Sequence, residues 1–213
     1  MRPTSFAPYT SLAEILLPHA ASGNDGSHDL AHIHRVFGNA RRIQAVEGGD
    51  GDVLAASVLL HDCVAVEKNS PLRAQASRLA ADKARGLLRE LGWPAARIEA
   101  VAHAILTHSF SANLVPETLE ARILQDADRL DAIGMIGAAR CFYIAGRLGS
   151  GLYDPDDPLA KERLLDDRRF AIDHFATKLF KLADGFQTQT GRQLAEERHA
   201  RLRTVLDLLL DEI

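Results

Sequence analysis

The sequence predicts an all-α protein, a bundle of about seven to eight helices with no sheet. Three observations lead to this prediction. Apolar residues recur at a spacing near 3.6 through most of the chain, which is typical of helices that bury one face. Clusters of glycine, proline and polar residues divide the chain into helix-length pieces. No segment alternates apolar and polar residues over six positions with the Val, Ile and Thr content of a strand.

The expected helices can be followed in order by their apolar residues. An amphipathic helix around residues 12–17 comes first, and Glu14 interrupts any signal-peptide core there. An almost entirely apolar helix is expected over residues 53–60. Apolar stripes at helical spacing cover residues 36–46, 79–91, 98–106, 175–186 and 202–210. Within these stripes, Lys83 is expected to extend its charged end to solvent.

Breaker residues mark the connections between these helices. Gly92-Trp93-Pro94 ends one helix and starts the next, with Pro94 in a first-turn position where a missing N–H costs nothing. The longest irregular segment is expected over residues 146–158, which hold three Gly and two Pro. Other connections are expected at residues 23–27, 48–52, 109–116 and 185–191.

Length and composition indicate one ordinary globular domain. The 213 residues are 46% hydrophobic and 25% charged, and we predict a single domain over residues 1–213, with its motifs between about residues 25 and 200. A net charge of −4 argues against binding to nucleic-acid polymers, which usually requires a basic face. No apolar run approaches the length of about 18 residues that a membrane helix needs. Cys63 and Cys141 lack a paired spacing, which favours the reducing cytoplasm.

Three places in the sequence could carry chemistry. His32 and Arg35 share a helix face, so an imidazole and a guanidinium lie together. His61-Asp62 ends the apolar helix, where a carboxylate needs a cation or several hydrogen-bond donors. Residues 126–131 place three carboxylates within two turns, and carboxylates this close raise one another's pKa unless a cation neutralises them.

Two His and two Asp form a mixed nitrogen and oxygen ligand set. This set suits Mn²⁺, Fe²⁺, Co²⁺, Ni²⁺ or Mg²⁺ with open positions better than a closed structural zinc site, which favours Cys. Open positions hold water, and a bound divalent ion makes that water a nucleophile near neutral pH. Basic residues beside such a centre indicate an anionic substrate, and arginine geometry favours phosphate.

The order His32, His61-Asp62, Asp128 resembles the H…HD…D pattern of the HD-domain phosphohydrolase superfamily, and longer motifs resemble its small bacterial YedJ-like branch. These motifs are HDLAHIHRV at residues 28–36, LHDC at 60–63, HSFS at 108–111, QDADRLDAIG at 125–134 and DHF at 173–175. The resemblance covers about residues 25–200. It implies an all-helical, metal-dependent fold that acts mostly on nucleotides and related phosphate esters.

The resemblance also implies roles for single residues. It assigns His32, His61, Asp62 and Asp128 to the metal. Asp128 is chosen on the acidic segment because the family's ligand Asp precedes a basic or small residue and then Leu, as in Asp128-Arg129-Leu130. Asp126 is the alternative ligand.

The general base does not follow the pattern of the family. Several HD nucleotide hydrolases have a Glu three residues after the HD Asp, and this chain has Ala65 there, with Glu67 two residues later. Asp62 or Asp131 could serve as the catalytic base instead.

Five residues are candidates for binding the substrate. Arg35 faces the His32 side, and the alternative for it is a structural ion pair. Lys68 follows the HD motif, with a solvated loop as the alternative. His108 ends a helix, where it could touch substrate or bound water. His174 and Lys178, spaced i, i+4, could close a phosphate pocket.

Three other residues are expected to be structural. His28 and Asp29 are interpreted as helix-capping residues or as groups that support the ligands, and His103 as a core histidine.

The sequence thus predicts a divalent-metal-dependent phosphohydrolase acting on nucleotides or related phosphate esters, such as a nucleoside triphosphate pyrophosphohydrolase or a nucleotide phosphatase. One metal ion is expected, with Mn²⁺ preferred over Mg²⁺, Co²⁺, Ni²⁺ or Fe²⁺. Two alternatives stay open: a nucleotide-binding regulatory HD domain with little turnover, and a helical scaffold with a structural ion. A homodimer through residues 206–210 also stays open against packing of these residues in the core.

Overall fold

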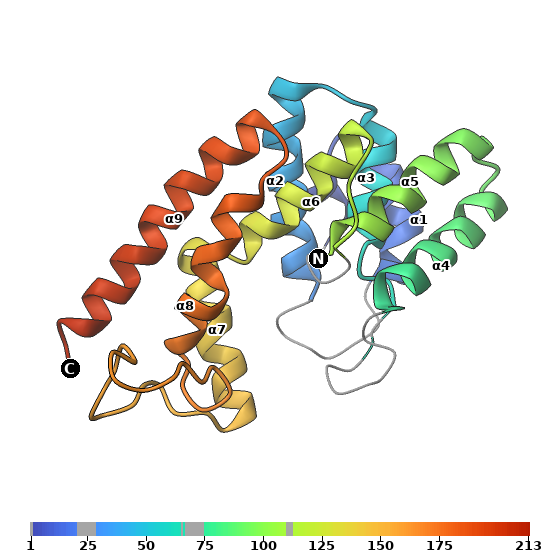
Figure 1. The fold of residues 1–213 in the computed structure, drawn as a ribbon. Coiled ribbons are helices and arrows are strands. Elements are labelled where there is room, and N and C mark those ends of the chain that lie inside the picture. Colours follow the sequence, from blue (N-terminus) through green and yellow to red (C-terminus); the bar gives the residue numbers. More distant parts are fainter. Residues whose placement is uncertain (1, 21–28, 65, 67–74, 110–112) are drawn as a thin grey trace. The chain divides into compact units, whose positions relative to one another are not determined.

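A computed structural model of the chain is all-α, as the sequence predicts (Figure 1). It describes residues 2–20, 29–64, 66, 75–109 and 113–213. These residues hold nine α-helices and no sheet, with one isolated bridge between Gly151 and Phe170. Among them, no helix combines the length and the apolar character needed to cross a membrane.

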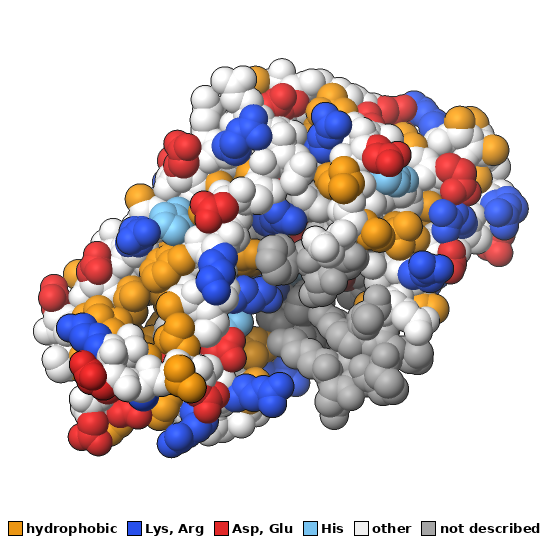
Figure 2. Space-filling view, in the orientation of Figure 1, with side chains coloured by type: hydrophobic (Ala, Val, Ile, Leu, Met, Phe, Trp, Pro, Cys, Tyr) orange, Lys and Arg blue, Asp and Glu red, His pale blue; other side chains and the backbone are white. Residues whose placement is uncertain are grey.

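The chain forms two compact units, Met1–Asp128 and Arg129–Ile213, and the boundary falls inside helix α6. The prediction of a single domain over residues 1–213 stays a prediction. Figure 2 shows acidic and basic side chains interspersed over the visible described surface of each unit.

In the first unit, the short helix α3 (Gly51–Leu60) forms the centre of the core. Every residue from Val53 to Leu60 is buried, which explains why this helix has no polar face. Asp50 caps its N-terminus, since Oδ1 accepts the N–H groups of Asp52 and Val53 at 3.0 and 3.2 Å. Helices α1 (Thr10–Ala20), α2 (Leu30–Glu47) and α5 (Ala95–His108) pack against it.

The remaining helices of this unit are α4 (Ala76–Glu90), which packs against α5, and α6 (Leu119–Asp131). The predicted break between α4 and α5 is confirmed. Gly92, two residues after the end of α4, has a φ of 74°. Pro94 is the N-cap of α5, one position before the first turn in which it was expected. A short 3₁₀ helix, η1 (Pro3–Phe6), precedes α1 and buries Phe6.

The second unit contains α7 (Gly134–Leu148), α8 (Asp173–Thr177), the 3₁₀ helix η4 (Leu179–Gly185) and α9 (Gln189–Leu210). The expected irregular segment at residues 146–158 begins later than predicted, because α7 continues through Gly146 and stops at Gly149, whose φ of 73° is left-handed. From there to Ile172 the chain has no helix.

The stripe at residues 175–186 forms two short helices instead of the single one expected. Lys178 leaves the helical region at φ −135°, ψ −57°, and the chain continues as η4. Leu179 and Leu182 are nevertheless buried. A spacing of three residues puts side chains on one face of a 3₁₀ helix as well as of an α-helix, so the sequence pattern does not separate the two.

Candidate metal centre

The candidate site is built at the end of the buried helix α3. His61 is the C-cap of α3 and is 1% exposed. Its Nδ1 atom donates a hydrogen bond to the carbonyl oxygen of Val58 at 2.8 Å. Because a carbonyl only accepts, Nδ1 carries the proton, and Nε2 of the neutral ring presents a lone pair. The local fold therefore fixes His61 in the tautomer that a metal ligand requires.

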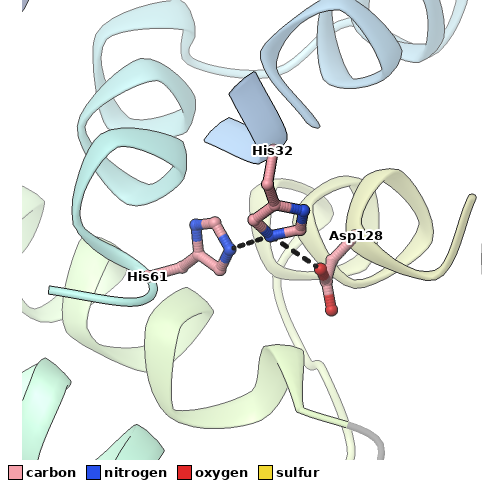
Figure 3. A group of neighbouring side chains, drawn as sticks. All are labelled: His32, His61 and Asp128. Carbon is pink, nitrogen blue, oxygen red and sulfur yellow. Dashed lines mark hydrogen bonds and ion pairs between the residues drawn. The ribbon is translucent and has the colours of Figure 1, made fainter. Parts of the chain in front are cut away.

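His32 and Asp128 reach the same place from two other helices. His32 lies in the first turn of α2, where Asp29 Oδ1 accepts the His32 N–H at 2.9 Å and so caps the helix, as expected for Asp29. His32 Nε2 lies 3.1 Å from His61 Nε2 and 3.5 Å from Asp128 Oδ1. In Figure 3 the three side chains point toward one another.

Asp62 and His108 complete the cluster. Asp62 Oδ2 lies 3.5 Å from His61 Nε2 and 3.7 Å from His32 Nε2. The other oxygen, Oδ1, lies 3.8 Å from Nε2 of His108, the last residue of α5. His108 Nδ1 donates to the Ile105 carbonyl at 2.6 Å, so in the neutral ring it is Nε2 that has the lone pair. The two oxygens of Asp62 thus face different imidazoles.

These spacings fit ligands that share one cation. Two atoms that each lie about 2.1 Å from an ion, at about 90–110° to one another, are separated by about 3.0–3.4 Å. The separations of 3.1, 3.5 and 3.7 Å between ligand atoms of His32, His61, Asp62 and Asp128 lie in or close to this range. The cluster is therefore consistent with a divalent metal site, and it presents nitrogen and oxygen donors together.

The protonation of His61 also suits a metal ligand. Burial lowers the pKa of His61, and the neighbouring Asp62 carboxylate opposes this effect without overcoming it. A lowered pKa keeps the ring neutral at pH 7, which leaves its lone pair available for a cation.

Two candidates on α6 lie outside this cluster among the described residues. Among the described residues, two groups could each hold a metal ion: His32, His61 and Asp128 form one, and His61, Asp62 and His108 form the other. Asp126, the alternative ligand, is fully buried and belongs to neither group. Asp131, a candidate base, is fully buried and bonded to Arg140 at 2.8 Å. Both roles stay predictions.

The predicted substrate-binding residues are distributed over the chain. Arg35 is half-buried on α2, one turn after His32. In the second unit, His174 bonds to Asp167 at 2.8 Å, and Lys178 is exposed directly after α8. Lys68 lies outside the described residues, as do His28, Ala65 and Glu67.

His103, the expected core histidine, is only half-buried and accepts the Glu117 N–H at 3.0 Å.

Sequence reasoning missed three polar residues near the candidate ligands. Asn39 and Gln125 are buried amides that bond to backbone carbonyls of other helices. Lys83 does not extend to solvent as predicted, because its Nζ donates to the carbonyls of Cys63 at 2.8 Å and His19 at 3.3 Å. In the sequence, a buried polar side chain that bonds to a distant carbonyl is indicated only by a polar residue at a position where the helical spacing predicts an apolar one.

Comparisons with known proteins identify the family. The model of the HD domain matches residues 29–133, a range that contains every residue of the cluster. The Bacillus subtilis protein YpgQ is 35% identical over 176 residues, which cover 81% of this chain and 78% of YpgQ.

Solved structures are similar over nearly the whole chain. A crystal structure of YpgQ in complex with ADP has a TM-score of 0.71 at 31% identity, covering 95% of this chain and 96% of that one. A structure from Bacillus thuringiensis, described as an HD-superfamily hydrolase, has a TM-score of 0.68 at 31% identity and covers 100% and 98% of the two chains. Membership of the YedJ-like branch stays a prediction. The motif, the fold and these relatives together show that the chain belongs to the HD-domain superfamily.

Proposed function

We propose that this protein is a divalent-metal-dependent phosphohydrolase that acts on nucleotides or related phosphate esters. The observation that supports this most is the meeting of His32 and His61, whose Nε2 atoms lie 3.1 Å apart. A carboxylate oxygen of Asp128 lies 3.5 Å from the His32 Nε2, and one of Asp62 lies 3.5 Å from the His61 Nε2. The nucleotide is suggested by the relative YpgQ, whose structure holds ADP, and by the similar chain described as an HD-superfamily hydrolase.

His32, His61, Asp62 and Asp128 would hold the ion, for which we favour Mn²⁺ over Mg²⁺, Co²⁺, Ni²⁺ or Fe²⁺. When bound, a divalent ion lowers the pKa of water toward neutrality and withdraws charge from a phosphoryl oxygen. His32 and His61 contribute neutral donors, while Asp62 and Asp128 contribute negative charge.

Asp62 and His108 are placed to orient a water molecule. Asp62 Oδ1 and His108 Nε2 lie 3.8 Å apart, and both accept hydrogen bonds when the His108 ring is neutral. A water that donates one proton to each would be held with its lone pairs directed away from both groups. We favour Asp62 over Asp131 as the base, because Asp131 is fully buried and bonded to Arg140.

For the phosphate, we propose Arg35 as a ligand, because it lies on α2 with His32 and a guanidinium can bind two phosphate oxygens at once. Lys68, His174 and Lys178 stay candidate substrate ligands from the sequence alone.

The test is metal-dependent turnover. Purified protein is stripped with a chelator, resupplied with Mn²⁺, Co²⁺ or Mg²⁺, and screened against nucleoside mono-, di- and triphosphates. We expect nucleotide hydrolysis that returns with the metal in the wild type and is lost in Asp62→Ala. Asp82→Ala, which removes an exposed carboxylate on α4, is the matched control and should keep full activity. Full metal-dependent activity in Asp62→Ala would contradict the proposal.

A nucleotide-binding regulatory domain with little turnover is the second candidate. It is favoured by Ala65 at the position where several HD hydrolases have Glu. The same screen separates the two, since a regulatory domain would raise its melting temperature with a nucleotide and show no hydrolysis.

A further inference from the structure

Two buried amide side chains connect the helices that carry the candidate ligands. Asn39 on α2 is 4% exposed, and its Nδ2 donates to the Ala127 carbonyl on α6 at 3.0 Å. Gln125 on α6 is 2% exposed, and its Nε2 donates to the Thr107 carbonyl on α5 at 2.8 Å. Both hydrogen bonds are buried and join segments far apart in the sequence.

Each bond attaches close to a cluster residue. Ala127 directly precedes Asp128, and Asn39 lies two turns after His32 on the same face of α2, because seven residues make almost two whole turns. The Asn39 bond therefore joins the ligand-bearing face of α2 to the ligand-bearing turn of α6.

The Gln125 bond does the same between α6 and α5. Gln125 lies one turn before Asp128 on the same helix face, and Thr107 directly precedes His108. The Thr107 carbonyl is among the last four of α5, which have no partner within the helix, so the Gln125 amide supplies a partner for it.

The rotation of α6 about its axis decides where the Asp128 carboxylate lies. A side-chain end at about 5–6 Å from the helix axis moves by about 1 Å when the helix rotates by roughly 10°. Metal ligands must be held to within about 0.5 Å, so a small rotation is enough to weaken the site. Hydrogen bonds from α6 to both neighbouring helices oppose this rotation.

We propose that Gln125 and Asn39 are positioning residues that hold Asp128 and His108 in place for the metal centre. This inference rests on the metal centre of the proposed function. The amide of Gln125 acts through its N–H group, since its Oε1 atom has no hydrogen-bond partner among the described residues.

The experiment compares Mn²⁺ binding, by calorimetry and by the electron paramagnetic resonance signal of bound Mn²⁺, in the wild type, Gln125→Met, Asn39→Leu and Asp128→Ala. Gln125→Met keeps the length of the side chain and removes the donor. Thr188→Ala is the matched control: it loses a buried polar contact, the hydrogen bond from Gly191 N that caps α9 in the second unit. Melting temperatures are measured for all variants.

We expect the dissociation constant for Mn²⁺ to rise about tenfold or more in Gln125→Met and Asn39→Leu. The resonance signal of the residual bound ion should also broaden. Thr188→Ala should lower the melting temperature and leave Mn²⁺ binding unchanged, which separates positioning from general stability. Asp128→Ala should abolish binding.

Two results would overturn the inference in different ways. If the wild type binds Mn²⁺ and the dissociation constants of Gln125→Met and Asn39→Leu stay within twofold of the wild-type value, the positioning role is removed and the proposed function is left intact. Absence of Mn²⁺ binding in the wild type would remove both.

Discussion

Two pairs of carboxylates, one pair in each unit of the molecule, have different neighbours. In the second unit, Asp131 lies 2.8 Å from Arg140, and Asp173 makes two bonds to Arg163 at 2.6 and 2.8 Å. In the first unit, Asp62 and Asp128 face imidazole nitrogens at 3.5–3.8 Å, which is too long for a hydrogen bond.

The difference separates acids that a guanidinium neutralises from acids that are spaced to share a cation. The guanidinium pairs of the second unit neutralise their carboxylates at contact distance, so they are structural. In the first unit the separation suits a cation placed between the ligands, and burial lowers the pKa of His61 and so reduces the positive charge that the protein itself supplies.

The largest effect is expected for the open cluster. Asp128→Ala should lower metal-dependent nucleotide hydrolysis by more than about 100-fold, because removing a ligand should cost more than removing a residue that supports one. Its melting temperature without metal should stay near that of the wild type. Steady-state rates with Mn²⁺ and thermal unfolding after chelation measure the two quantities, and full activity would show that the cluster is not the centre.

The closed pairs should matter for stability instead. Arg140→Ala leaves the fully buried Asp131 carboxylate without its 2.8 Å partner, so we expect the free energy of unfolding to fall by about 3 kcal/mol. Urea denaturation measures this. The double variant Asp131→Leu/Arg140→Ala should recover part of the loss, since no charge is then left buried. An unfolding free energy unchanged in Arg140→Ala would contradict the structural role.

The stability that the Asp173–Arg163 pair contributes should depend on pH. Burial alone would raise the pKa of Asp173, but the bonds from Arg163 and from the Asp166 N–H outweigh it and hold this pKa below the usual 3.8. A lowered folded-state pKa adds stability above the unfolded-state pKa, which is lost as the pH falls through the folded-state value. Between pH 5 and pH 3, the wild type should therefore lose more stability than Asp173→Asn. Equal losses would show that the pair does not shift the pKa.

The smallest effect is expected at the start of α9. Thr188 caps this helix by accepting the Gly191 N–H at 2.9 Å, so Thr188→Ala should cost about 1 kcal/mol of unfolding free energy. Thr188→Ser keeps the oxygen and serves as the control in the same denaturation series. Metal-dependent activity should be unchanged in Thr188→Ala, and a loss of that activity would contradict a purely stabilising role of Thr188.

The fold can be predicted from the sequence wherever the spacing of apolar residues is compatible with only one kind of secondary structure. The uninterrupted run at residues 53–60 predicts a buried helix, and α3 is buried along it. The sequence fails where two structures share a spacing, as in the η4 segment, and where a glycine is tolerated inside a helix, as at Gly146 of α7.

The candidate site is less derivable than the fold. His32 and Asp128 are 96 positions apart, and no rule of local spacing brings them to within 3.5 Å, so their meeting was expected only from the resemblance to the HD superfamily. Asn39 and Gln125 could not be identified, because an amide that bonds to a distant backbone carbonyl leaves no repeat in the sequence.

We propose that His32, His61, Asp62 and Asp128 hold a single cation. Crystals grown with Mn²⁺ and measured on both sides of the manganese absorption edge test it most directly. We predict one anomalous peak within about 2.0–2.3 Å of His32 Nε2, His61 Nε2 and the carboxylates of Asp62 and Asp128. The proposal would be contradicted if the four side chains kept this arrangement but no anomalous peak lay between them, at a manganese concentration that supports hydrolysis.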